Sequence, residues 1–174
     1  STHIIYIDGN GVMRWSDTRR EASFFGVNYT LPFAHAYRAI GYLELDRKAA
    51  IDKDVYHISR LGLNAYRIHI WDVEISDAEG NLLENEHLEL LDYLIHKLQE
   101  RGIRTVITAQ TDFGNGYPER NQPTGGFSSH YDKCAVHSDA EAIAVQEKYI
   151  AALVRHVNPY TGYAYKDDPY IVGF

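Results

Sequence analysis

The alternation of two sequence periods along the chain is the feature that most constrains its fold. Short runs of mostly apolar and β-branched residues, typical of strands, occur at 24–29, 64–71, 103–109 and 170–174. Between them, apolar residues recur every three or four positions, which is the period of a helix. Strands that alternate with helices lie parallel and are joined by right-handed crossovers. The sequence therefore predicts an α/β fold.

Three segments between these strands carry one apolar face at the helical period. They are a helix at 46–61 followed by Gly62, a helix with the stripe Leu88 to Leu98 ended by Gly102, and a helix opened by Ser138-Asp139-Ala140-Glu141. Glycine readily adopts the left-handed conformation that ends many helices. The Ser-x-x-Glu pattern is a capping box, which satisfies the first free N–H groups of a helix.

The first 22 residues have a different pattern. Two strand-like runs, Ile4-Ile5-Tyr6-Ile7 and Val12-Met13-Arg14-Trp15, flank the turn Asp8-Gly9-Asn10-Gly11. Such an arrangement predicts a β-hairpin. We therefore expect a hairpin at 1–22 and an α/β domain at 23–174.

Loop lengths distinguish two arrangements of the parallel strands. The segments Thr30 to Leu45 and Thr111 to His137, after the first and third strands, are expected to be long loops, whereas the turns at Gly62 and Gly102 are minimal. Long loops at the carboxyl ends of the strands are typical of (β/α)8-barrel enzymes. A doubly wound open sheet has the same bias more weakly and stays an alternative, although the chain lacks G-x-G-x-x-G and a Walker-type lysine.

Composition excludes several classes of protein. The net charge of −7 and the absence of a clustered basic face argue against a nucleic-acid partner. No run of about 18 apolar residues is present, so no membrane span is expected. The single cysteine, Cys134, forms no intramolecular disulfide. The start at Ser1 shows no leader, and we expect a secreted, periplasmic or cell-surface protein whose signal peptide has been removed.

Three groups of residues carry a resemblance to a known family. They are Phe25-Gly26-Val27-Asn28, the stretch Leu61-Gly62-Leu63-Asn64-Ala65-Tyr66-Arg67-Ile68, and Asn158-Pro159-Tyr160-Thr161-Gly162 with Tyr165-Lys166-Asp167-Asp168-Pro169-Tyr170-Ile171. With them, residues 25–174 resemble the glycoside hydrolases built on (β/α)8 barrels, most closely the family 5 cellulase and mannanase type. The resemblance implies the N-terminal half of a TIM barrel, with about four β/α units and truncated at strand four.

This resemblance implies a retaining hydrolase that acts on a β-linked polysaccharide or oligosaccharide of the β-mannan or β-glucan type, without a cofactor. Such enzymes use two carboxyl groups about 5 Å apart, one as acid/base and one as nucleophile. The family's two glutamates come from strands four and seven, after Phe174, so the chain is expected to hold no catalytic residue and to be inactive alone. Domains rarely end on a buried strand such as 170–174, so we expect an imposed boundary there.

Arg67 is the supporting site residue that the resemblance implies, because the family's arginine on strand two hydrogen-bonds the nucleophilic carboxylate. The alternative is an arginine that forms a structural salt bridge. Residues at the ends of the first three strands or just after them, or in the first loop, are predicted to bind substrate. They are Asn28, Tyr29, His35, Tyr37, Arg38, His69, Trp71, Asp72, Gln110 and Asp112. Asn28 could equally cap its own loop, and Trp71 could equally pack in the core.

Potential metal ligands occur in the predicted loop 111–137. They are His130, Asp132, Cys134 and His137. Their spacing matches no standard zinc pattern, so no metal is expected, and the loop is interpreted as a rim that closes over a polysaccharide cleft. Glu84, Glu86 and Glu89 are interpreted as a solvated first helical turn, favoured by the helix dipole.

The expected partner is therefore a carbohydrate. A half-barrel leaves its first and fourth strands as open edges, which tend to pair with another chain. We expect them to pair with the remaining half of the barrel or with a second copy. Two other functions stay open: a non-catalytic carbohydrate-binding or scaffold half-barrel, and an unrelated doubly wound α/β enzyme.

Overall fold

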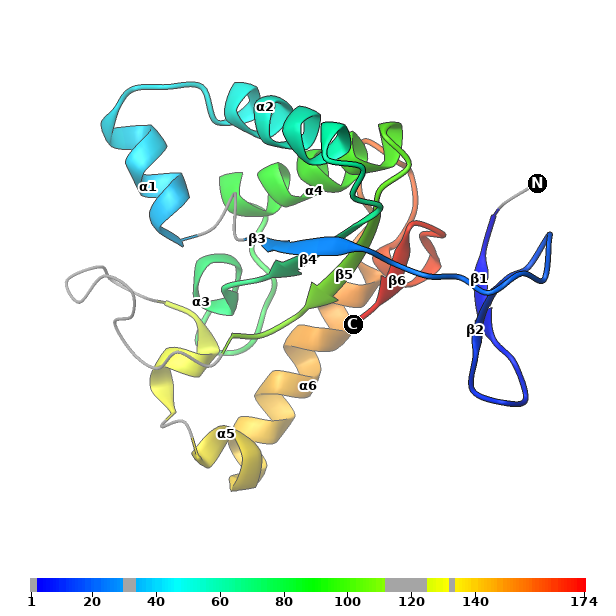
Figure 1. Cartoon of the computed structure of the whole chain (residues 1–174). Coiled ribbons are helices and arrows are strands. Elements are labelled where there is room, and N and C mark those ends of the chain that lie inside the picture. The colour runs from blue at the N-terminus through cyan, green and yellow to red at the C-terminus, as the bar shows by residue number, and fades with distance from the viewer. Residues whose placement is uncertain (1–2, 30–33, 112–124, 132–133) are drawn as a thin grey trace.

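The computed structural model describes residues 3–29, 34–111, 125–131 and 134–174. They form a two-stranded antiparallel hairpin and a four-stranded parallel sheet in the order β3-β4-β5-β6 (Figure 1). The spatial order of the sheet follows the order along the chain, as expected for consecutive β/α units. The α/β fold and the N-terminal hairpin are confirmed.

The hairpin consists of β1 (Ile5–Ile7) and β2 (Met13–Trp15). The sheet consists of β3 (Gly26–Tyr29), β4 (Ala65–His69), β5 (Arg104–Thr108) and β6 (Ile171–Gly173). The helices are α1 (Ala34–Tyr42), α2 (Arg47–Arg60), α3 (Asp72–Ile75), α4 (Glu86–Glu100), α5 (Ala135–Ser138) and α6 (Ala140–Arg155), with 3-10 turns η1 (Phe127–His130) and η2 (Tyr165–Asp167).

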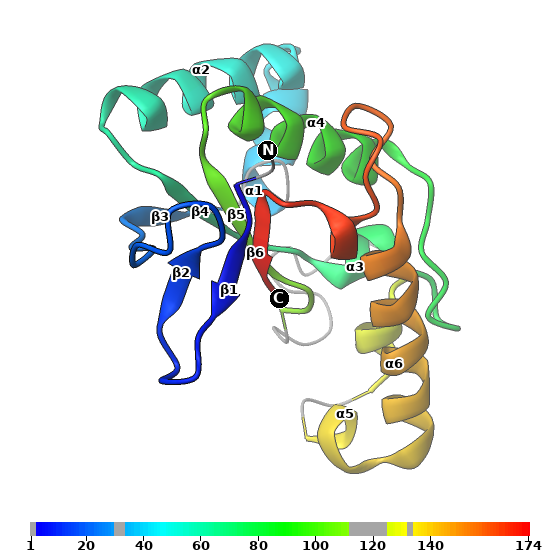
Figure 2. The same cartoon turned by 90° about the vertical axis from the view of Figure 1, so that its right-hand side faces the viewer.

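The core lies on one face of the sheet. Side chains of a strand alternate between its two faces, and on β4 and β5 the alternate residues Tyr66, Ile68 and Ile107 are buried under the helices. On the opposite face Arg67 is exposed, and Thr108 is half-buried. The helices α2, α4 and α6 all contribute to this single core (Figures 1 and 2). A doubly wound sheet would need helices on both faces, so the one-sided core fits a barrel half instead.

Local signals set most helix ends. Asp46 caps α2 by accepting hydrogen bonds from the backbone N–H groups of Lys48 and Ala49, at 2.8 and 3.2 Å. Gly62 and Gly102 have φ of 76° and 71°, as their predicted roles as helix stops require.

The predicted cap of α6 is wrong by one residue. Asp139, rather than Ser138, accepts the hydrogen bond from the backbone N–H of Ala142, at 2.9 Å. The Ser138 hydroxyl instead donates to the backbone carbonyl of Cys134, within the short helix α5. An aspartate next to a serine is an equally good cap, and the geometry of α5 engages the serine.

The segment predicted as a loop from Thr30 to Leu45 contains α1. Gly41 suggested a loop, but Tyr37 and Ile40 pack against the core and stabilise a helix there. The short helix α3 was likewise not predicted. In both cases tertiary packing overrides a weak local preference.

Asn64, in the motif that leads into β4, anchors the start of β3 through its side chain. Its side-chain oxygen accepts a hydrogen bond from the N–H of Phe25, at 2.7 Å, and its amide nitrogen donates to the carbonyl of Ser23. A single side chain before β4 therefore fixes the start of β3.

Arg104 joins the hairpin to the sheet. Its guanidinium lies 5.1 Å from the ring centroid of Trp15 in β2 and 4.0 Å from that of Tyr170, just before β6. The ring of His3 stacks on Trp15 at 4.0 Å. The hairpin thus packs beside the N-terminal end of β5, and the division at residue 22 stays a prediction.

Candidate functional site

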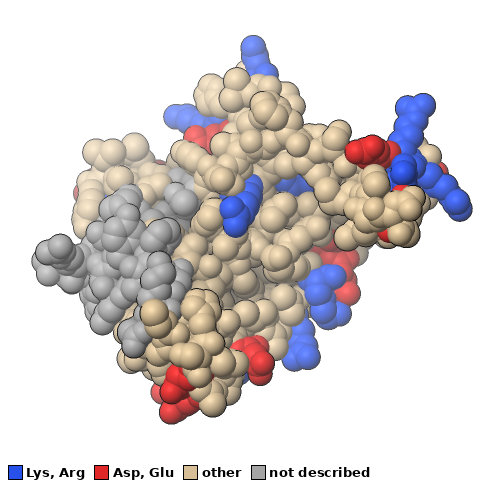
Figure 3. All heavy atoms as spheres, turned by 60° about the horizontal axis from the view of Figure 1, so that its bottom comes forward, with Lys and Arg blue, Asp and Glu red and all other residues tan. Residues whose placement is uncertain are grey.

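The strand register brings predicted site residues together on the open face. Asn28 pairs with Arg67, and Arg67 pairs with Val106, so these three side chains lie in one row across the sheet. A hollow of about 140 Å³ surrounds this row; its lining residues are Gly26, Val27, Asn28, Ala65, Arg67 and Val106. Figure 3 shows the molecule from below, the side away from α2 and α4, with some Lys or Arg atoms near the middle of the face and other charged atoms around its margin.

Arg67 is the charged residue at the centre of this row. Its Nε donates a hydrogen bond to the Thr108 hydroxyl oxygen at 3.0 Å. Within the part of the chain that the structure describes, Arg67 forms no ion pair. Its remaining N–H groups can therefore bind an incoming acceptor, such as a carboxylate or a sugar hydroxyl.

His69 and Tyr29 lie at the carboxyl ends of the strands. His69 is half-buried, and burial together with the positive charge of Arg67 lowers the pKa of its imidazole, which favours the neutral form. Tyr29 is 39% exposed and meets Tyr66 edge to face at 6.3 Å. Gln110, just beyond β5, is half-buried. His69, two residues after Arg67, shares the open face with it, whereas Tyr29 pairs with the buried Ile68 and lies near Asp54 of α2, on the face that the helices cover.

Trp71 and Asp72 follow β4 but lie inside the protein. Trp71 is 5% exposed and belongs to the core, so its ring presents no open platform. Asp72 is fully buried and accepts a hydrogen bond from the Ser128 hydroxyl of η1. Burial raises the pKa of Asp72 to about 6. Asp72 thus lies under η1 and Trp71 lies in the core, so neither lines the open face.

Tyr37 and Arg38 attach α1 to its neighbours. The Tyr37 hydroxyl donates to a carboxylate oxygen of Glu86 at 2.6 Å, and its ring lies 3.8 Å from that of His87. Arg38 forms an ion pair with Glu74 at 2.7 Å, and both side chains are mostly buried. The Tyr37 ring also lies under the guanidinium of Arg47, so the contacts found for Tyr37 and Arg38 are structural ones to α2, α3 and α4.

Two predicted residues lie outside this description. His35 belongs to α1, but its side chain is outside the described residues, and Asp112 is outside them entirely. Of the potential metal ligands, Asp132 is also outside. Among the residues that are described, no group of three or more His, Cys, Asp or Glu side chains is placed to hold a metal ion. None of the described helices is long and apolar enough to span a membrane.

The acidic residues near the start of α4 are solvated, as expected. Glu84 precedes the helix and has 86% of its side chain exposed, and Glu86 and Glu89 lie in the first turn with 52% and 40% exposed. Glu86 also contacts Tyr37 and Arg47, and Glu89 forms an ion pair with Lys48 at 2.6 Å. These glutamates link α4 to α1 and α2, whose positions the sequence pattern alone could not provide.

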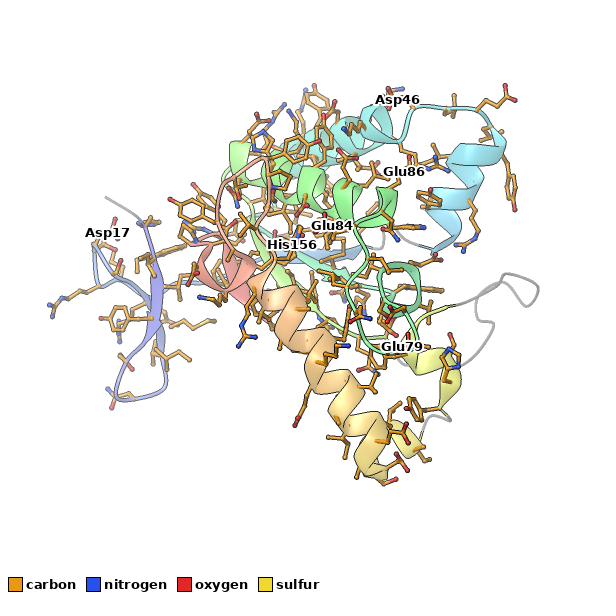
Figure 4. All side chains as sticks on the ribbon, turned by 180° about the vertical axis from the view of Figure 1, so that it is seen from behind. Asp17, Asp46, Glu79, Glu84, Glu86 and His156 are labelled. Carbon is orange, nitrogen blue, oxygen red and sulfur yellow. The ribbon has the colours of Figure 1, made fainter. Side chains whose placement is uncertain are left out.

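A buried polar cluster behind the sheet was missed by sequence reasoning. The Asp92 carboxylate contacts Nε2 of His156 at 2.8 Å and accepts a hydrogen bond from the Tyr165 hydroxyl at 2.6 Å. Burial raises the pKa of Asp92 despite these contacts. Figure 4 shows His156 near Glu84, at the end of α6. The cluster ties α4 to the segment that leads into β6, and its only sequence signal is the Tyr165 motif.

Comparison with known proteins identifies the class of fold. No protein-family model matches the chain. Among solved structures, an endo-1,4-β-mannanase from Rhizomucor miehei has 20% identity and a TM-score of 0.62, over 99% of this chain and 45% of that chain. A glycoside hydrolase family 5 mannosidase from Rhizomucor miehei has 17% identity and a TM-score of 0.66, over 98% of this chain and 47% of that one. An endo-β-1,4-mannanase from Thermotoga petrophila has 21% identity and a TM-score of 0.60, over 87% and 34%.

The chain therefore has the fold of part of a (β/α)8 barrel of the glycoside hydrolase family 5 type. It spans less than half the length of each of these three structures. The likeness in fold agrees with the resemblance of the sequence motifs.

Proposed function

We propose that the chain is part of a retaining glycoside hydrolase that acts on β-linked polysaccharide or oligosaccharide, with β-mannosides as the first candidates and β-glucans as the second. The observation that carries this proposal is the position of Arg67, on the open face of β4 beside Asn28, in a sheet whose fold matches mannanases and mannosidases. The preference for mannosides comes from these similar structures, which are mannanases and mannosidases.

The proposed chemistry needs two carboxyl groups. One stays protonated to release the leaving sugar, and the other attacks the anomeric carbon as a carboxylate. An arginine suits the second group because its guanidinium stays charged and offers a fixed fork of donors. We assign this role to Arg67. Asn28 and His69 flank it and are suited to hydrogen-bonding sugar hydroxyls.

Neither catalytic carboxylate is proposed to come from residues 1–174. The four strands β3 to β6 contain no Asp or Glu. Asp72, the carboxylate that follows β4, is buried under η1. The 174-residue chain should accordingly hydrolyse no glycoside on its own.

The reading frame that encodes the chain gives the most direct test. We expect codons for an Asn-Glu pair immediately after Phe174, and a later glutamate at the end of a seventh barrel strand. In the longer enzyme, Arg67→Met should lower kcat on β-mannan far more than it raises KM. A reading frame that continues past Phe174 without the Asn-Glu pair would contradict the proposal.

A non-catalytic carbohydrate-binding half-barrel is the second candidate, favoured by the absence of acidic residues from the four strands. Isothermal titration of the 174-residue chain with manno- and cello-oligosaccharides separates the two. If the chain is a binding module, it must bind these oligosaccharides with measurable affinity by itself. If it is part of an enzyme, it need not bind them without the rest of the barrel.

The open sheet edges suggest a partner. In the described part of the chain β3 and β6 are each paired on one side only, and Phe25 next to β3 is 72% exposed. We propose that these edges pair with the remaining half of a barrel or with a second copy of the chain. Light scattering after size-exclusion chromatography should show self-association of the isolated chain, and a clean monomer would contradict it.

A polysaccharide substrate implies a location outside the cytoplasm. We therefore propose a secreted, periplasmic or cell-surface protein. Fractionation of cells that express the native gene, followed by immunodetection, tests this.

A further inference from the structure

The hydrogen bond from Arg67 to Thr108 is diagonal to the strand register. Arg67 pairs with Val106, but its Nε reaches Thr108, two residues further along β5. Residues two apart on a strand share a face, so Val106 and Thr108 both lie on the open face. The Arg67 side chain therefore leans toward the carboxyl ends of the strands, the end at which barrel enzymes carry their sites.

Thr108 is well suited to hold this orientation. A β-branched residue has few χ1 rotamers, so the strand backbone largely fixes its hydroxyl oxygen. The register places Thr108 beside His69, which confines the hydroxyl further. An arginine with one bound Nε–H keeps its four terminal N–H donors in a known plane.

We propose that Thr108 is a positioning residue for Arg67: it accepts the Nε–H bond and so turns the two terminal nitrogens of the guanidinium toward the carboxyl ends of the strands, ready to bind a carboxylate bidentately. This inference rests on the proposed function, in which Arg67 serves a catalytic carboxylate. Without the anchor, the long arginine side chain samples many rotamers and loses more conformational entropy when a ligand binds.

Two substitutions at Thr108 test the role, with sodium acetate as the carboxylate probe. Thr108→Val keeps the shape and removes the hydroxyl, whereas Thr108→Ser keeps the hydroxyl. In ¹H–¹⁵N spectra of the 174-residue chain, the Arg67 Nε–H signal, assigned from its loss in Arg67→Met, should exchange slowly with water in the unsubstituted chain and in Thr108→Ser. It should exchange quickly in Thr108→Val, and acetate affinity should fall by about three- to tenfold.

Thr105→Val is the matched control on the same strand. Thr105 is fully buried on the opposite face, under the helices, so its substitution should leave both the Arg67 signal and acetate binding unchanged. Unchanged exchange and affinity in Thr108→Val would overturn the inference. So would a loss that Thr108→Ser fails to restore, or the absence of any acetate-dependent shift of the Arg67 signal in the unsubstituted chain.

The same experiment separates this inference from the proposed function. If Thr108→Val frees Arg67 but the reading frame lacks the Asn-Glu pair, Thr108 still positions the arginine, and the glycosidase assignment fails. If the pair is present and Thr108→Val changes nothing, the enzyme assignment stands without a role for Thr108.

Discussion

Ser128 in η1 donates a hydrogen bond to the carboxylate of Asp72, 56 residues earlier in the chain and fully buried. This contact fastens η1 to α3, the segment that follows β4. It also covers a titratable group just beyond the carboxyl end of β4.

Asp72→Asn should stabilise the chain at neutral pH. Because the folded pKa of Asp72 is raised from 3.8 to about 6, the stability linked to its neutral form is complete below pH 4 and is lost as pH rises through 6. Asparagine stays neutral and keeps an oxygen for Ser128. A difference of roughly 2 pKa units sets an upper limit of about 3 kcal/mol on this gain at pH 7.5, and the gain vanishes near pH 4.

Urea unfolding at the two pH values measures this gain. Asp167→Asn is the control, because Asp167 has an exposed side chain and should change the free energy of unfolding by less than about 0.5 kcal/mol. A loss of stability in Asp72→Asn at pH 7.5 would show that its charge is better compensated than its burial implies.

Gly126→Ala should loosen η1, whereas Gly125→Ala should be tolerated. A Cβ at Gly126 would lie 2.3 Å from the Cα of Val73, and a Cβ at Gly125 would meet nothing within 4 Å. The backbone must shift to relieve the first clash, which we expect to reduce the free energy of unfolding by about 1–3 kcal/mol. Near-UV circular dichroism and urea unfolding of both variants check this, and equal stabilities would contradict the close packing of η1 on α3.

Tyr165→Phe should destabilise the chain by about 1–3 kcal/mol, because Asp92 loses a hydrogen bond in a buried setting. Tyr163→Phe is a matched control two residues earlier, at a side chain that is 46% exposed. Chemical denaturation of the pair measures the difference. If both variants retain full stability, the buried cluster contributes nothing to the packing of the segment before β6.

Glu74→Gln should weaken the attachment of α1 to α3, because it breaks the ion pair with Arg38. Burial alone would raise the pKa of Glu74, but its contacts with His87 and Arg38 outweigh burial and lower it, so the carboxylate stabilises the fold above its normal pKa and this contribution is lost as pH falls. Breaking a mostly buried ion pair reduces stability by about 3 kcal/mol. Amide hydrogen exchange at pH 7 should become faster in α1.

Glu79→Gln provides the comparison, because the Glu79 side chain is exposed and the contacts found for this residue use its backbone N–H and carbonyl (Figure 4). Protection of α1 should be unchanged in that variant. The difference between Glu74→Gln and the unsubstituted chain should narrow as the pH falls below 4. A constant difference would argue that packing, and not charge, holds α1.

The parts of this fold that the sequence predicted are those with local causes. Asp46 caps the helix that it begins, and Gly62 ends the same helix, so both are visible within a few residues. The helix α1 was missed because its anchors are distant: Arg38 reaches Glu74, and Tyr37 reaches Glu86.

The candidate site likewise contains some residues with local sequence signals and others whose positions depend on distant parts of the chain. Arg67 and Asn28 follow from strand alternation and from the resemblance of their motifs, and the register brings them together. The burial of Asp72 depends on η1, more than fifty residues later, which no local pattern reveals. Thr108 carried no signal of its own, because its role depends on which residue of the neighbouring strand lies diagonal to it.

The contact between Trp15 and Arg104 places the two tryptophans of the chain in different regions, where each can serve as a fluorescent probe. Trp15 and Trp71 are its two tryptophans, one held between His3 and Arg104 in the hairpin region and the other enclosed in the core. Fluorescence of Trp15→Phe would report on the core alone, and that of Trp71→Phe on the hairpin alone. Comparing their unfolding curves would show whether the hairpin melts together with the sheet or before it.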